Sequence, residues 1–245
     1  MKKILLALLM VPFALCVWAQ NKQEVHILSS NDMHAAIECF PRFCFVADSL
    51  RTLYPDLLVL SAGDNRSGDP INDMYEIPAY PMVSLMNIVG FHATTLGNHE
   101  FDSGEKGLAK LITMSDFSYL CANCHPAAST GIHVRPWQMF DVGGVRLAII
   151  GVTALGPMGK PESHPDNMTH IEFTDPLQTV QQYKYLRQQS DVVLLLSHMG
   201  YEDDVKLSKE LPWVDLIVGG HSHTQLNGGE MHNGLLIKQN VNRLA

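Results

Sequence analysis

Short apolar runs alternate with amphipathic segments along most of the chain. Residues 192–196 are wholly apolar, which is typical of a strand buried on both faces. Between residues 43 and 53, Phe43, Val46, Leu50 and Leu53 recur at the spacing of one helix face. The strands expected from such patterns are residues 24–30, 57–60, 91–96, 119–122, 137–141, 145–152, 192–196, 216–218 and 235–238. The expected helices are residues 43–53, 81–89, 105–114, 175–189 and 203–211.

The order of these elements predicts the fold class. Strands that alternate with helices imply an α/β sandwich whose central strands are largely parallel. Residues 137–141 and 145–152 are expected to form a hairpin that turns at Gly143-Gly144. Residues 156–169 hold three prolines and are expected to form a long loop of the kind that often serves a site. The chain stops soon after residues 235–238, which leaves open whether the sandwich lacks its last strands.

Residues 1–19 have the pattern of a signal peptide. Lys2 and Lys3 precede an apolar run over residues 4–15, and residues 17–19 form a small-x-small cleavage site. The run is too short for a stable bilayer anchor. We therefore expect cleavage before Gln20, export to the periplasm or the medium, and a single catalytic domain over residues 20–245.

Composition and charge narrow the class of protein. The chain is 46% hydrophobic and 17% charged, which indicates a globular protein. Removing Lys2 and Lys3 takes the formal charge from −8 to −10, because residues 1–19 contain no acid. An acidic protein is a poor general binder of nucleic acid. No later segment has the length or apolarity of a membrane span.

Four cysteines remain after cleavage: Cys39, Cys44, Cys121 and Cys124. In an oxidising compartment this number favours two disulfides, with three pairings to choose from. Cys121 and Cys124 form a Cys-x-x-Cys motif, but a strand precedes it and no helical pattern follows, unlike the redox motif of thioredoxin-like units. We expect a structural disulfide or two independent thiols there rather than a redox dithiol or half of a zinc knuckle.

Five of the expected strands end in residues that bind metals. These residues are Asp32 and His34, Asp64, Asn98 and His99, His198, and His221 and His223. Any one of them has an ordinary explanation as a turn cap or a buried imidazole. Open α/β sheets bind ligands beyond the carboxyl ends of their strands, so all five groups are expected on one rim. Five such coincidences favour a metal site.

The ligand types limit which metals fit. Carboxylate, imidazole and amide groups suit Zn²⁺, Mn²⁺ or Fe²⁺ rather than Ca²⁺. The ligands are too many for one four-coordinate ion, whereas two ions about 3.5–4 Å apart would use them all. Asp102 follows His99 by three residues, close enough in a turn to orient that ring.

Taken together, these motifs resemble a known family. Residues 31–34, 63–64, 97–102, 197–200 and 219–223 follow the order found in the calcineurin-like metallophosphoesterases. The chain is most similar to the catalytic domain of the secreted 5′-nucleotidase and 2′,3′-cyclic phosphodiesterase family, from Val25 to about Arg243. The resemblance implies a four-layer α/β/β/α sandwich that hydrolyses phosphate esters, with nucleotides as first candidates.

The same resemblance implies roles for individual residues. It assigns Asp32, His34 and His223 to the first ion, Asn98, His198 and His221 to the second, and Asp64 to a bridge between them. His99, paired with Asp102, is not a ligand and would stabilise the transition state or protonate the leaving oxygen. Asn98 and His99 would also contact the substrate. The implied reaction is in-line attack on phosphorus by a metal-bound hydroxide.

The resemblance leaves alternatives open. In the family a C-terminal domain supplies much of the nucleotide pocket, and this chain ends where that domain would begin. Either a separate chain supplies the pocket, or the substrate differs, or the sequence is a fragment. A thiosulfohydrolase with the same metal site is the alternative within the family. A non-catalytic metal-binding or ligand-binding module is the alternative outside it, although pure binding has no use for the His99–Asp102 pair.

Overall fold

The computed structural model describes residues 23–244. The expected signal peptide at residues 1–19 lies outside this range. Within residues 23–244, no helix is both long enough and apolar enough to cross a bilayer.

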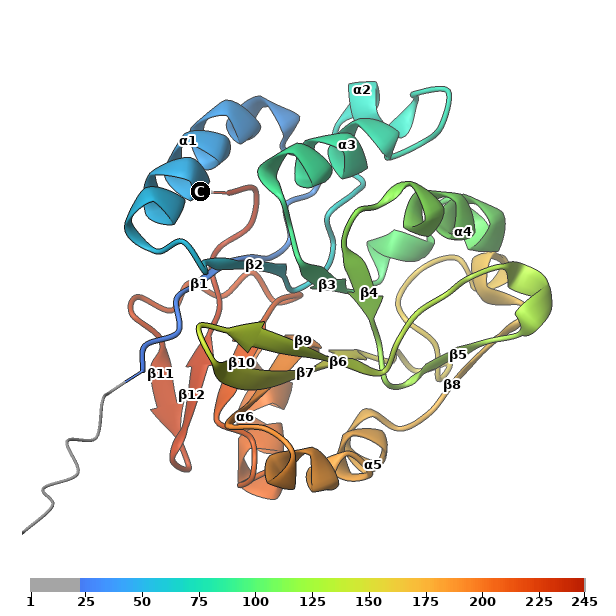
Figure 1. The fold of residues 1–245 in the computed structure, drawn as a ribbon. Coiled ribbons are helices and arrows are strands. Elements are labelled where there is room, and N and C mark those ends of the chain that lie inside the picture. The colour runs from blue at the N-terminus through green and yellow to red at the C-terminus, as the bar shows by residue number, and fades with distance from the viewer. Residues whose placement is uncertain (1–22, 245) are drawn as a thin grey trace, which may run out of the picture.

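Two β-sheets packed face to face form the centre of the fold (Figure 1). The first has the order β1-β2-β3-β4 and is parallel throughout. Its strands are β1 Ile27–Ser30, β2 Leu58–Ser61, β3 Ala93–Thr95 and β4 Ser118–Leu120. The second has the order β11-β12-β10-β9-β7-β6, with its four central strands parallel and its edge strands antiparallel to their neighbours. Its strands are β6 Trp137–Val142, β7 Val145–Thr153, β9 Val192–His198, β10 Leu216–Gly219, β11 Glu230–His232 and β12 Leu235–Lys238.

Helices cover the outer faces of both sheets. The helices on the first sheet are α1 Phe40–Leu53, α3 Tyr80–Val89 and α4 Gly104–Met114, and those on the second are α5 Pro176–Gln181 and α6 Tyr201–Glu210 (Figure 1). Alternate strand residues face opposite layers, as the pleat requires. Val59 packs with the helices of the first sheet, whereas Leu58 and Leu60 pack against the second sheet. The expected four-layer α/β/β/α sandwich is therefore confirmed.

The long helix expected over residues 175–189 is wrong. The α-helix α5 ends at Gln181, and a 3-10 helix, Lys184–Gln188, follows. The apolar positions Leu177, Val180, Tyr183 and Leu186 recur at every third residue, which is the period of a 3-10 helix. Tightening the backbone after α5 therefore keeps Leu186 in the same core as Val180.

Several short elements were not expected from the sequence. They are the four-residue helix α2 Pro70–Asp73, the edge strand β11, and a small antiparallel sheet of β5 Cys124–Pro126 with β8 Ile171–Phe173. Each is three or four residues long, too short to show a period.

The structure holds Cys39, Cys44, Cys121 and Cys124 as free thiols, so the expected disulfides are wrong for this structure. Cys121 and Cys124 are buried, and the Cys121 thiol donates to Oδ1 of Asn123 at 3.4 Å. They are free thiols in the core, and the contact with Cys121, together with burial, raises the pKa of the Cys124 thiol, so the pair is neither a disulfide nor two independent thiols.

Candidate metal centre

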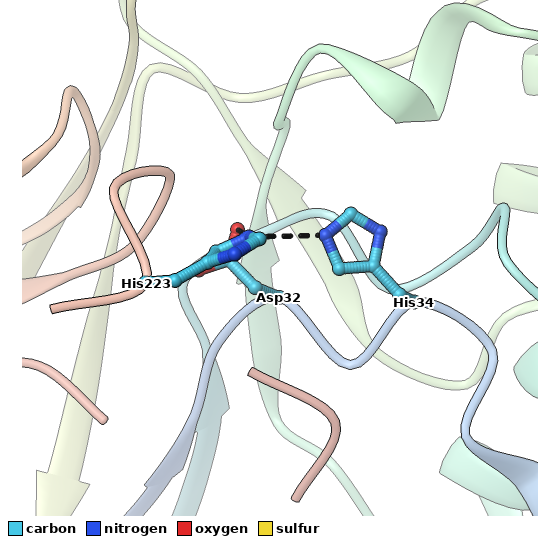
Figure 2. Close-up of side chains that lie close together, drawn as sticks. All are labelled: Asp32, His34 and His223. Atoms are coloured by element: carbon cyan, nitrogen blue, oxygen red, sulfur yellow. Dashed lines mark hydrogen bonds and ion pairs between the residues drawn. The ribbon is translucent and has the colours of Figure 1, made fainter. Parts of the chain in front are cut away.

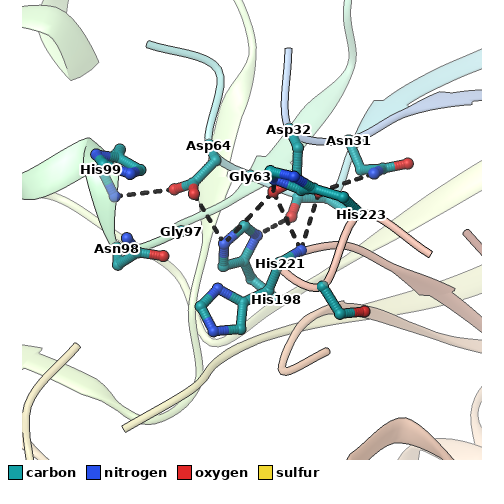
Figure 3. A network of polar contacts seen from close by, with 12 residues as sticks. Asn31, Asp32, Gly63, Asp64, Gly97, Asn98, His99, His198, His221 and His223 are labelled. Atoms are coloured by element: carbon teal, nitrogen blue, oxygen red, sulfur yellow. Dashed lines mark hydrogen bonds and ion pairs between the residues drawn. The ribbon is translucent and has the colours of Figure 1, made fainter. Parts of the chain in front are cut away.

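The seven candidate ligands converge where the two sheets meet at the carboxyl ends of their strands, and all of them except His34 are labelled in Figure 3. Asp32 follows β1 and Asp64 follows β2, both in loops of the first sheet. His198 is the last residue of β9, and the His221 loop follows β10, so these ligands come from the second sheet. The site is therefore built across the sandwich and depends on how the sheets pack.

One group of ligands consists of Asp32, His34 and His223 (Figure 2). One ligand atom from each lies within 4.8 Å of the others. Nε2 of His223 is 3.2 Å from Nε2 of His34 and 3.3 Å from Oδ1 of Asp32. Nδ1 of His34 lies 3.1 Å from the Ser67 carbonyl, which accepts its proton and leaves Nε2 free as a ligand.

A second group consists of Asp64, His198 and His221, again within 4.8 Å. Nε2 of His198 lies 3.2 Å from Oδ2 of Asp64. Asn98 lines a cavity of about 110 Å³ together with His198 and His221, which places it beside this group. Asp64 also forms a group with His34 and His99, so its carboxylate lies between the two sets.

Two buried polar atoms at the centre lack an ordinary hydrogen-bond partner: Oδ1 of Asn98 has none, and Nε2 of His198 has only the Asp64 carboxylate, 3.2 Å away. Leaving such atoms unpaired is costly, and native structures rarely do so. Nδ1 of His198 donates to the Ala62 carbonyl at 2.6 Å, and Nδ2 of Asn98 donates to the Glu162 carbonyl at 3.2 Å. Both remaining atoms are therefore oriented as ligands, and this donor set fits a divalent cation.

The charges at the centre are strongly coupled. Burial opposes charging of the His198 ring, but the Asp64 and Asp32 carboxylates outweigh it and raise its pKa to about 10. Burial likewise opposes ionisation of Asp64, yet the His198 charge holds the pKa of that carboxyl well below its usual range. Burial lowers the pKa of His34 and of His221. Because imidazole ligands bind metals in the neutral form, cation binding must displace the His198 proton.

Five candidate ligands have left-handed backbone torsions. Their φ angles are 49° at Asp32, 44° at His34, 50° at Asp64, 77° at His221 and 53° at His223. Residues other than glycine rarely adopt this region, and each instance costs about 1–3 kcal/mol. Such strain is typical of functional sites.

Glu100 organises the centre, although the sequence pattern assigned it no role. It is buried, and its carboxylate accepts the backbone N–H groups of Asp64 (2.9 Å), Asn65 (2.8 Å) and Gly97 (2.6 Å). It therefore ties the loop after β2 to the loop after β3. A signal was present, because Glu100 is an acid that directly follows two candidate site residues, Asn98 and His99.

His99 and Asp102 lie beside the ligands. Nδ1 of His99 is 2.8 Å from Oδ2 of Asp102, and the backbone N–H of His99 donates to Oδ1 of Asp64 at 2.8 Å. The hydrogen bond to Asp102 raises the pKa of His99 to about 9, so the ring is protonated at neutral pH. Burial opposes ionisation of Asp102, but its hydrogen bonds from His99 and Ser67 outweigh that effect and lower its pKa.

Comparison with known proteins identifies the family of this chain. The UshA protein of Yersinia enterocolitica is 30% identical over 231 residues, covering 84% of this chain and 42% of its own length. The NAD 5′-nucleotidase of Haemophilus influenzae is 33% identical over 190 residues, covering 76% of this chain and 31% of its own length. The solved structure of the Haemophilus influenzae NAD nucleotidase superposes with a TM-score of 0.73 at 29% identity, over 83% of this chain and 44% of that one.

The chain thus spans less than half the length of these relatives. The model for calcineurin-like phosphoesterases matches residues 25–225, which include every candidate ligand and the His99–Asp102 pair. The chain belongs to the calcineurin-like phosphoesterase family.

Proposed function

We propose that this chain is an exported hydrolase of phosphate esters that uses two divalent cations. We propose nucleotides as its substrates. The observation that carries the proposal is the convergence of two groups of metal-binding side chains, with the buried Oδ1 of Asn98 unpartnered beside them and a protonated His99 next in the chain. A relative named NAD 5′-nucleotidase supports the choice of nucleotides. The sequence pattern of residues 1–19 supports export.

Two sets of residues would hold the cations. Asp32, His34 and His223 would bind the first, Asn98, His198 and His221 the second, and Asp64 would bridge them. Bound there, the cations would polarise the phosphoryl oxygens and activate a water molecule for attack on phosphorus.

The role of His99 follows from its contacts. Asp102 accepts the Nδ1 proton, so the proton at Nε2 is the one available to a substrate. With a pKa of about 9, His99 carries that proton throughout the neutral range. The proton can pass to the leaving oxygen as the bond to phosphorus breaks, and Asp102 stabilises the charged ring before that transfer.

The test is hydrolysis by the purified protein loaded with Mn²⁺ or Zn²⁺. AMP, 2′,3′-cyclic AMP and an aryl phosphate are offered with and without a chelator. We expect chelator-sensitive release of phosphate, and His99→Ala is expected to lose activity while keeping its cations. The exposed His133, which lies outside the centre, provides His133→Ala as a matched control.

The outcomes separate the alternatives. Turnover of nucleotides supports the full proposal, and turnover of the aryl ester alone refutes nucleotides as the substrate. A folded protein that binds two cations and hydrolyses none of the three esters refutes phosphoesterase activity. Export is tested by fractionating cells that express the full chain or residues 20–245, and equal distribution of the two would contradict it.

A further inference from the structure

Asp102 is held by more than His99. Its Oδ2 accepts from Nδ1 of His99 and from the Ser67 hydroxyl, and its Oδ1 accepts from the Ser163 hydroxyl at 3.0 Å. Nδ2 of Asn167 also donates to the Asp102 carbonyl at 3.4 Å. Both carboxylate oxygens therefore have fixed donors, and the plane of the carboxylate is set from two sides.

Ser163 belongs to the loop of residues 156–169, which follows β7. The preceding residue, Glu162, accepts the Asn98 amide on its carbonyl at 3.2 Å. Glu162 therefore contacts the candidate ligand Asn98, and Ser163 contacts Asp102, the partner of the His99 ring. The loop is the structural link between the two.

The loop is itself well anchored. Met168 is fully buried in the core of the first sheet, and its carbonyl accepts from Nζ of Lys160 at 2.7 Å. Just beyond the loop, His170 pairs with Glu105 of α4 at 3.0 Å. The Ser163 hydroxyl is therefore presented from a supported backbone, as accurate positioning requires.

Hydrogen bonds to one oxygen alone, here those from His99 and Ser67 to Oδ2, restrain a carboxylate less than bonds to both oxygens. With only Oδ2 held, Asp102 can rotate about the bond to its carboxyl group, and the line from Oδ2 to Nδ1 of His99 tilts. Hydrogen bonds weaken steeply as the donor angle falls. The Ser163 hydroxyl, bonded to Oδ1, opposes that rotation. It therefore keeps the His99 imidazole oriented toward the substrate.

We infer that Ser163 is a positioning residue for the leaving-group proton donor, acting on His99 through the Asp102 carboxylate. The inference rests on the proposed phosphoesterase function and adds a residue that the metal site does not include. The hydrogen bonds that Ser163 donates go to Asp102 and to the Pro161 carbonyl, and neither partner is a candidate ligand. Its effect should consequently depend on how much the leaving group needs a proton.

The test compares esters of graded leaving groups. Ser163→Ala, loaded with Mn²⁺, is assayed against 4-nitrophenyl phosphate, phenyl phosphate and AMP. A nitrophenolate leaves with little protonation, whereas the alkoxide of AMP needs a proton. We expect kcat to fall on the order of tenfold for AMP, less for phenyl phosphate and least for the nitrophenyl ester, with KM and bound Mn²⁺ unchanged.

Two matched variants control for disturbance of the loop. Ser163→Thr keeps a hydroxyl and should restore AMP turnover. Thr169→Val removes a hydroxyl from the same loop that bonds only the Asp166 carbonyl at 3.0 Å, so it should behave as wild type. Equal loss on all three esters in Ser163→Ala, or failure of Ser163→Thr to rescue, would overturn the inference.

A second readout does not depend on turnover. Nitrogen-15 NMR of labelled histidines reports the Nδ1–H of His99, which should shift in Ser163→Ala and stay in place in Thr169→Val. If the wild type hydrolyses no ester, the phosphoesterase proposal fails, while this shift still decides whether Ser163 positions the ring. An unchanged His99 signal in Ser163→Ala would refute the positioning role.

Discussion

Replacing Glu100 with glutamine tests how the centre is held together. The carboxylate accepts two donors on each oxygen: Oε1 takes the backbone and side-chain N–H groups of Asn65 at 2.8 and 3.3 Å, and Oε2 takes the backbone N–H groups of Asp64 and Gly97 at 2.9 and 2.6 Å. Glutamine offers one oxygen and turns an NH₂ group toward the other pair. Two buried donors then lose their acceptor.

The expected change in the free energy of unfolding combines two opposing effects. Two unsatisfied donors cost about 2–6 kcal/mol in all, at about 1–3 kcal/mol each. Burial raises the pKa of Glu100, so removing its charge returns part of that cost. We therefore expect the unfolding free energy of Glu100→Gln to fall by about 2 kcal/mol, the lower end of the range.

The assay is urea unfolding of the chelated protein, so that cation binding does not contribute. At an m-value of about 3 kcal/mol/M, the midpoint should fall by roughly 0.7 M with no change in m. Glu202→Gln, an exposed change on α6, is the control and should leave the midpoint in place. A midpoint for Glu100→Gln equal to or above that of the wild type would show that the hydrogen-bond accounting is wrong.

Three further predictions concern the same rim. Gly97→Ala would push a methyl group into Oδ1 of Asp64, so bound metal measured after gel filtration should fall well below that of wild type, and full occupancy would contradict the geometry. Saturating Mn²⁺ at a hundred times its dissociation constant should add about 2.7 kcal/mol, or about 5–11 °C in the thermal midpoint, and a chelator should reverse it. The folded pKa of His99, about 9, exceeds its ordinary 6.5, so the His99–Asp102 pair stabilises the chelated protein fully below pH 6.5 and progressively less through pH 9. The gap in urea midpoint between wild type and Asp102→Asn should narrow over that interval, and a constant gap would refute the pKa shift.

Much of the fold could be predicted from the sequence because long elements carry a clear period. The buried strand β9 is evident from its apolar run, and the helix α1 was expected from its apolar spacing. The predicted face of α1 is only partly right, because Phe43 and Leu50 pack on the core whereas Val46 and Leu53 are exposed.

The rule that ligands gather at carboxyl strand ends was enough to put Asp32 and His198 on one rim from the sequence alone. The remaining parts depend on long-range packing. Residues as far apart as Cys124 and Phe173 pair in the small sheet, and no local pattern encodes that contact.

The candidate site also has parts that the sequence reveals and parts that depend on the folded structure. Residue types that bind metals could be recognised from sequence, since Asp, Asn and His at strand ends are chemically conspicuous. The supporting residues were harder to recognise. Glu100 carried only the signal of its place after Asn98 and His99, and Ser163 carried none, because their hydrogen bonds to Asn65 and Asp102 span 35 and 61 positions.

The left-handed torsions of the candidate ligands set a limit on how this protein can be stabilised. At about 1–3 kcal/mol each, five of them together rival the 5–15 kcal/mol by which a whole domain is usually stable. A chain selected for heat resistance alone would relax these positions and lose the geometry that gathers the ligands. Substitutions meant to raise thermal stability should therefore be placed in the outer layers, around α5 and α6, and should leave the strained candidate ligands unchanged.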